Sequence, residues 1–144
     1  MIKLTRTYED FNGVTRTEDF WFNLTKAELM EFQTSVNGGM NTLLEGMIQA
    51  KDQATLIKYA KKLVIMSYGE KSLDGREFYK SEEIINKFIA TPAFSDIFYD
   101  VATNDEYAAM FVNGIVPKEI REEVAKEIEE QKKQQFEVVD NKQS

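Results

Sequence analysis

Helix-capping signals recur at short intervals after residue 24, and they limit most of the chain to short helices. Thr25 and Glu28 form a capping box, Ser81 precedes two glutamates, and Thr91 precedes a proline. Apolar residues follow each start signal at spacings of three and four positions, which is typical of a helix with one buried face. The sequence therefore predicts a mainly α fold, in which about six or seven short helices form a bundle over residues 25–131.

Two of the predicted helices show the pattern most clearly. The helix that Asp52 can cap runs to Ser67, and its apolar stripe consists of Leu56, Tyr59, Ala60, Leu63 and Met66. The helix before it covers residues 40–48 and follows a turn at Asn37-Gly38-Gly39. A second capping box, which begins at Thr103, opens a later helix. Three methionines are expected in the core, namely Met30 on the helix that begins after Thr25, Met47 on the helix over residues 40–48, and Met66 on the helix that runs to Ser67.

The first 23 residues differ from the rest, because they predict a β-hairpin. Residues 2–11 and 14–23 flank Asn12-Gly13, a pair favoured at the two central positions of a type I′ turn. This register places Leu4 opposite Trp21 and Arg6 opposite Asp19. One face of the hairpin then carries Ile2, Leu4, Tyr8 and Trp21, and the other carries Phe11, Val14, Phe20 and Phe22. Both faces are partly apolar, so each is expected to be covered.

Nothing in the sequence divides the chain into separate folding units. Residues 70–80 are mostly polar and are centred on the turn dipeptide Asp74-Gly75. We expect one globular domain over residues 1–131, made of the hairpin (2–23) and the helical bundle. Residues 132–144 are mostly polar and are expected to form a disordered tail.

The composition excludes several classes of chemistry. The 144 residues include no cysteine and no histidine, so disulfides, thiolate metal sites and Ser-His or Cys-His nucleophiles are absent. The formal charge of −7 disfavours nucleic-acid binding. No signal peptide, membrane span, phosphate-binding loop or calcium loop is visible, and no cofactor or metal is expected. A hydrolase with two carboxylates distant in sequence remains open, but a binding protein that is not an enzyme is the favoured interpretation.

The candidate partner-binding residues are apolar and lie in the second half of the chain. Five aromatic residues occur close together, and they form either part of the core, which is the stronger interpretation, or a groove for a partner helix. The last predicted helix begins at Pro117 and has a narrow apolar stripe, which either contacts a partner or packs on its own domain. The full set is Phe94, Phe98, Tyr99, Tyr107, Phe111, Ile120, Val124 and Ile128.

Several segments together resemble the tail assembly chaperones of long-tailed bacteriophages of the siphovirus type. The order and spacing of the segments carry the resemblance, since none is a catalytic motif. The matching segments are residues 8–28 (YEDFNGVTRTEDFWFNLTKAE), 67–72 (SYGEKS), 74–76 (DGR), 78–81 (FYKS) and 111–117 (FVNGIVP).

The resemblance implies a non-enzymatic role in the cytoplasm of the host bacterium. Chaperones of this family bind the long tape measure protein, keep it soluble, help to recruit tail tube protein around it, and leave before the tail is complete. Many are made in two lengths by a ribosomal frameshift, and the Lys132-Lys133 codons are one possible slippage site. Self-association is also compatible with this role.

Two other functions remain open from the sequence. One is a different phage tail protein, such as a completion or connector protein that forms a homo-oligomer. The other is a transcriptional or host-takeover adaptor, which would usually carry a basic recognition helix that this sequence lacks.

Overall fold

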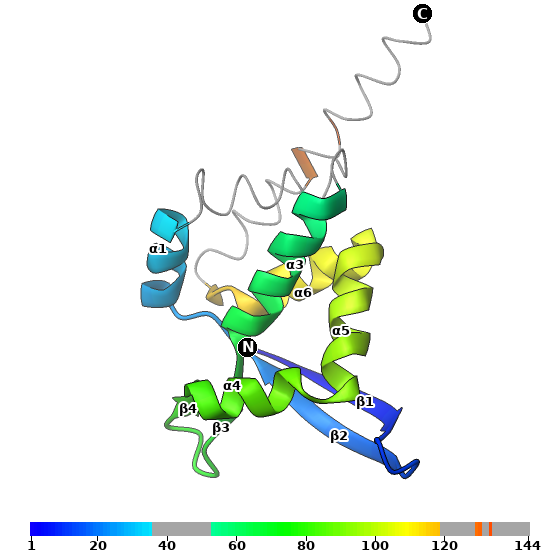
Figure 1. The fold of residues 1–144 in the computed structure, drawn as a ribbon. Coiled ribbons are helices and arrows are strands. Elements are labelled where there is room, and N and C mark those ends of the chain that lie inside the picture. Colours follow the sequence, from blue (N-terminus) through cyan, green and yellow to red (C-terminus); the bar gives the residue numbers. More distant parts are fainter. Residues whose placement is uncertain (36–52, 119–128, 131–132, 134–144) are drawn as a thin grey trace, which may run out of the picture.

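The computed structural model describes residues 1–35, 53–118, 129–130 and 133. Within these residues the chain forms a four-stranded antiparallel sheet in the order β1-β2-β3-β4, together with five helices (Figure 1). The strands are β1 (Ile2–Glu9), β2 (Thr15–Phe22), β3 (Tyr68–Lys71) and β4 (Phe78–Tyr79). The helices are α1 (Lys26–Ser35), α3 (Gln53–Ser67), α4 (Glu82–Ile89), α5 (Pro92–Thr103) and α6 (Asp105–Ile115).

The prediction of a mainly α bundle of six or seven helices after a lone hairpin is therefore wrong, and the fold is mixed. Strands β3 and β4, which have four and two residues, were not predicted from the sequence. Strands this short do not show the alternation of polar and apolar residues by which a strand is recognised. The predicted turn at Asp74-Gly75 is present, but it connects these two strands.

The predicted hairpin of β1 and β2 is present, but its register differs by one residue from the prediction. Leu4 pairs with Phe20, and Lys3 pairs with Trp21. Because side chains alternate between the faces of a strand, a shift of one residue moves a whole strand's side chains to the opposite face. Phe20 and Phe22 therefore share the core face with Ile2, Leu4 and Tyr8, whereas Trp21 lies on the open face. Only one face of this hairpin needs a cover.

The error arose in the turn, which has three residues between its closing pair instead of two. The Asp10 amide donates to the Val14 carbonyl (2.9 Å), and the Gly13 amide donates to the Asp10 carbonyl (2.9 Å). Gly13 has φ +81°, so the loop is a turn followed by a residue in the left-handed region. The Asp10 carboxylate fixes this loop by accepting from the amides of Asn12 and Val14, each at 2.9 Å, and from the Arg16 guanidinium.

Strand β3 follows α3 without a linker and pairs with the end of β2. Trp21 lies opposite Gly69, and the Asn23 amide donates to the Ser67 carbonyl at 2.7 Å. On its other side, β3 lies so close to β4 that position 69 requires glycine. A Cβ on Gly69 would lie 2.6 Å from the Phe78 ring and 2.8 Å from the Tyr79 carbonyl oxygen. The β3–β4 pair therefore joins the helical part of the chain to the long hairpin.

Three of the predicted helix starts are confirmed within the described residues, at Thr25, Ser81 and Thr91. Ser81 accepts from the Ile84 amide, and Thr91 accepts from the Phe94 amide, each at 3.2 Å. The predicted box at Thr103 is displaced by one residue, because Asn104 is the residue that caps α6. An amide side chain caps a helix as well as a hydroxyl does, so the sequence pattern fitted both positions.

The helices cover one face of the sheet, and the core lies between that face and the helices (Figure 1). Phe20, Phe22 and Leu24 enter it from β2 and the residues just after it, and Ala60 and Leu63 confirm the predicted stripe of α3. The odd-numbered residues of β1 are all exposed, which leaves the other face of the long hairpin open.

Several predicted elements lie outside the described residues. They include the helix over residues 40–48, the cap at Asp52, most of the last helix with Ile120, Val124 and Ile128, and all of the tail except residue 133. The division into a domain over residues 1–131 and a tail stays a prediction.

Candidate partner-binding surface

Aromatic rings form a continuous cluster through the core. The Tyr68 ring stacks on Phe88 with centroids 3.8 Å apart, and Phe22 meets the edges of Phe88 and Phe111 at 5.8 and 5.1 Å. Phe88 also contacts Phe94 at 5.4 Å. Such pairs each contribute roughly 0.5–1.5 kcal/mol beyond the apolar area that they bury. This cluster joins β2, β3, α4, α5 and α6, and it accounts for much of the aromatic content of the sequence.

The five aromatic residues predicted as candidates fall into three environments. Phe94 and Phe111 are buried in the core, and Phe98 stacks on Phe94 at its margin. Tyr107 is half-buried, and its hydroxyl accepts a hydrogen bond from Arg6. Tyr99 is 66% exposed, so it is the member of the set that is most available to a partner. The structure does not gather all five on one exposed surface.

Arg6 connects β1 with the two helices above it. One guanidinium nitrogen lies 2.7 Å from the Asp100 carboxylate, and another donates to the Tyr107 hydroxyl. Burial by itself lowers the pKa of Arg6, but the bonds to Tyr107 and Asp100 outweigh it and raise the pKa. The pKa of Tyr107 is raised, chiefly by burial. This cluster is internally paired, and it holds α5 and α6 against β1.

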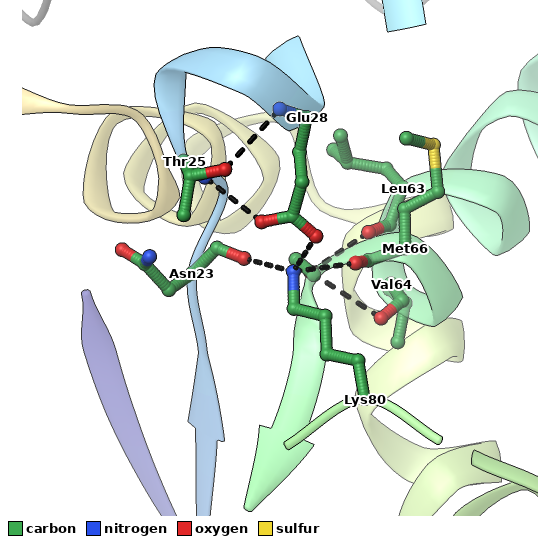
Figure 2. A network of polar contacts seen from close by, with 8 residues as sticks. Asn23, Thr25, Glu28, Leu63, Val64, Met66 and Lys80 are labelled. Carbon is green, nitrogen blue, oxygen red and sulfur yellow. Dashed lines mark hydrogen bonds and ion pairs between the residues drawn. The ribbon is translucent and has the colours of Figure 1, made fainter. Parts of the chain in front are cut away.

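Lys80 is at the centre of a second polar network, which Figure 2 shows. Its ammonium donates to the Asn23 carbonyl (2.6 Å), the Met66 carbonyl (2.9 Å) and the Glu28 carboxylate (2.6 Å). Glu28 also completes the predicted capping box, since it accepts from the Thr25 amide at 3.0 Å. Lys80 thereby joins the end of β2, the start of α1 and the end of α3.

The charges in this network respond differently to their partial burial. Burial would raise the pKa of Glu28, but the hydrogen bonds from Lys80 and Thr25 outweigh it and lower the pKa. Burial lowers the pKa of Lys80, and its bond to Glu28 offsets this effect only in part. All three ammonium hydrogens have acceptors, so the geometry is that of a structural clamp and leaves no donor for a ligand.

The two most exposed large apolar side chains of the described residues lie at the tips of the two hairpins, one at each tip. Phe11, in the β1–β2 turn, is 84% exposed, and Val14 beside it is also exposed. Leu73, in the β3–β4 turn, is fully exposed. A large apolar side chain gains free energy when a partner covers it, at roughly 25 cal/mol per Å² of apolar area. We call Phe11, Val14 and Leu73 the hairpin-tip residues.

The hairpin-tip residues were not among the partner-binding candidates predicted from the sequence. The available signal was an apolar residue inside a turn, next to Asn12-Gly13 in one case and Asp74-Gly75 in the other, where polar residues are usual. The prediction that Met30 lies in the core was also wrong, because its side chain on α1 is 64% exposed.

The part of the chain that the structure describes contains neither a cluster of metal-binding side chains nor a membrane-spanning helix. No group of three or more histidine, cysteine, aspartate or glutamate side chains is placed to hold a metal ion there. Among the same residues, no helix combines the length and the apolar character needed to cross a bilayer.

The model of a family described as "phage tail assembly chaperone" matches residues 1–144, which is the whole chain. No curated protein and no solved structure matches the chain.

Proposed function

The chain belongs to the phage tail assembly chaperone family, and from this premise we propose that it binds the tape measure protein of its phage and keeps it soluble during tail assembly. The match over the full length is the observation that carries the proposal, and it agrees with the resemblance found in the sequence. We also propose that the chain helps to recruit tail tube protein around the tape measure protein. Both steps are binding steps in the host cytoplasm, without covalent chemistry.

The surface of the protein supports a binding role of this kind. The hairpin-tip residues and Tyr99 expose large apolar side chains at separate points. Contacts that are individually weak but repeated along one long partner give a stable complex that can still be displaced later. The formal charge of −7 favours solubility of the complex.

The contribution of the hairpin tips can be tested with paired substitutions. The variant Phe11→Ser/Leu73→Ser removes both exposed apolar tips, and we expect it to retain at least tenfold less tape measure fragment than the parent chain in a co-purification assay. The matched control, Phe11→Leu/Leu73→Met, keeps both positions apolar and is expected to retain the fragment. Both side chains are exposed, so neither change should unfold the domain.

Equal retention by the serine and the control variants would remove Phe11 and Leu73 from the proposed surface. If neither variant nor the parent chain retains any fragment, the proposed partner itself is wrong. If the parent chain instead forms a closed ring and does not bind the fragments, the alternative function of a connector protein would be favoured.

A further inference from the structure

Strand β1 forms one edge of the sheet, and its outer side has no strand partner among the described residues. β1 is the first strand of the sheet, so it has a strand neighbour on one side only. It is eight residues long and contains no proline, glycine or bulge. An edge of this kind readily pairs with another strand.

The hydrogen-bond pattern shows which residues point their backbone groups outward. The Asp10 amide donates to Val14, so Asp10 and Val14 form a hydrogen-bonded pair. Hydrogen-bonded and non-hydrogen-bonded pairs alternate along an antiparallel ladder, which places the even-numbered residues of β1 in the bonds to β2. Lys3, Thr5, Thr7 and Glu9 therefore direct their amides and carbonyls to the free edge, where no backbone partner is present among the described residues.

We propose that the free edge of β1 pairs with β1 of a second copy of this chain, in an antiparallel arrangement centred on Arg6. The proposal goes beyond the proposed function, because it concerns contacts between chaperone copies. Two-fold symmetry then places Lys3 of each copy opposite Glu9 of the other, and Thr5 opposite Thr7. The faces also match, since odd-numbered residues meet odd-numbered residues and the two sheets continue as one.

Charge complementarity selects this arrangement over its nearest alternative. Opposite charges directly across a ladder stabilise the pair, and like charges destabilise it. Centring the pair on Thr5 instead places Lys3 opposite Thr7 and leaves both Lys3–Glu9 pairs unformed. The two Arg6 side chains that meet at the centre are each already bound to Asp100 of their own copy at 2.7 Å. Lys3 and Glu9 are both exposed. The Lys3 ammonium lies 5.7 Å from the centroid of the Trp21 ring within its own copy, and pairing with Glu9 of a second copy would replace or extend that contact.

Charge exchange at the two positions gives a direct test on the full chain alone. The dimer dissociation constant is measured by sedimentation equilibrium for the parent chain, Lys3→Glu, Glu9→Lys and the double variant. Each single variant puts like charges opposite each other twice, and we expect dimerisation about tenfold weaker in both. The double variant restores both ion pairs with their charges exchanged. We expect its dimer dissociation constant to lie within about threefold of that of the parent.

The single variants also separate this contact from general repulsion between acidic molecules. Lys3→Glu makes the chain more negative, whereas Glu9→Lys makes it less negative. General repulsion predicts tighter association for Glu9→Lys, and the proposed pairing predicts weaker association for both. The amides of Thr5 and Thr7 should gain protection from hydrogen exchange as protein concentration rises, while an exposed amide in the Asp74-Gly75 turn serves as the control.

A parent chain that stays monomeric at all concentrations would overturn the proposal. So would a dimer whose dissociation constant is unchanged in both single variants, or one in which the Thr5 and Thr7 amides gain no protection. None of these results depends on the tape measure protein, so a failure here is distinct from a failure of the proposed function.

Discussion

Individual polar residues at the junctions of this fold have effects that depend on how far they are buried. Lys80 and Lys87 each pair with a glutamate, but the side chain of Lys80 is 15% exposed and that of Lys87 is 76% exposed. Only Lys80 also satisfies two backbone carbonyls. The two lysines therefore form a matched pair for testing the contribution of the polar clamp.

We predict that Lys80→Met lowers the free energy of unfolding by about 2–3 kcal/mol, because it leaves the Asn23 and Met66 carbonyls and the Glu28 carboxylate without their donor. The control Lys87→Met removes an exposed ion pair and should cost less than about 0.5 kcal/mol. Urea unfolding of the two variants measures the difference. Equal effects would show that Lys80 does not hold the three elements together.

Tyr68 provides a pH-dependent prediction. Burial, together with the negative charges of Glu70 and Glu18, raises its pKa from 10.0 to about 12. The folded chain therefore keeps this proton at a pH where the unfolded chain releases it. The contribution of Tyr68 to stability is complete below pH 10 and is lost as the pH rises from 10 towards 12, by roughly 2 kcal/mol.

The comparison of the parent chain with Tyr68→Phe isolates this effect, because phenylalanine keeps the ring and removes the ionisable group. Urea unfolding between pH 8 and pH 11.5 should show a steeper alkaline loss of stability in the parent. Parallel pH profiles would mean that Tyr68 has the same pKa in the folded and the unfolded chain.

At the scale of elements, local signals predicted the helix starts well and the sheet poorly. Ser81 and Thr91 cap their helices as predicted because a cap depends on residues within one turn of each other. The hairpin register depended on whether Phe11 belonged to the strand or to the turn, and the residue pair Asn12-Gly13 fits both loop lengths. Strand β4 has two residues, and it exists through pairing with β3 and not through any pattern of its own.

The β3–β4 pair gives a test at this scale. Gly69→Ala places a methyl group against the Phe78 ring and the Tyr79 carbonyl, and we expect a loss of about 2–3 kcal/mol in unfolding free energy. Gly75→Ala is the control, because its surroundings are open and only its φ of +77° is strained, at a cost of about 1 kcal/mol. A smaller loss for Gly69→Ala than for Gly75→Ala would show that the close approach at β3 is not tightly packed.

For the candidate site, the sequence located the aromatic residues but did not sort core from surface. Phe94 and Phe111 complete the core, which depends on contacts with β2 and α4 that no local pattern reveals. Tyr99 occurs between them in sequence and is exposed. Phe11 and Leu73 are prominent only because their turns project them into solvent, and a turn's projection depends on the strands that support it.

At the scale of the whole molecule, the helices lie on one face of the sheet, and no described element covers the opposite face of the long hairpin or the β1 edge. The apolar side chains at the hairpin tips and on α5 are dispersed. This arrangement suits repeated contacts with an extended partner better than the enclosure of a small ligand. Family membership assigns the class of function, and the partner remains the proposal on which the account depends.

The most direct measurement of that proposal is the solubility of the tape measure protein with and without this chain. The two genes are co-expressed from one vector, and the soluble fraction of tape measure protein is quantified against a matched vector that expresses an unrelated acidic protein of similar size. We expect the tape measure protein to move from the insoluble to the soluble fraction and to co-purify with this chain. A tape measure protein that stays insoluble, or becomes soluble equally well with the unrelated protein, would contradict the proposal.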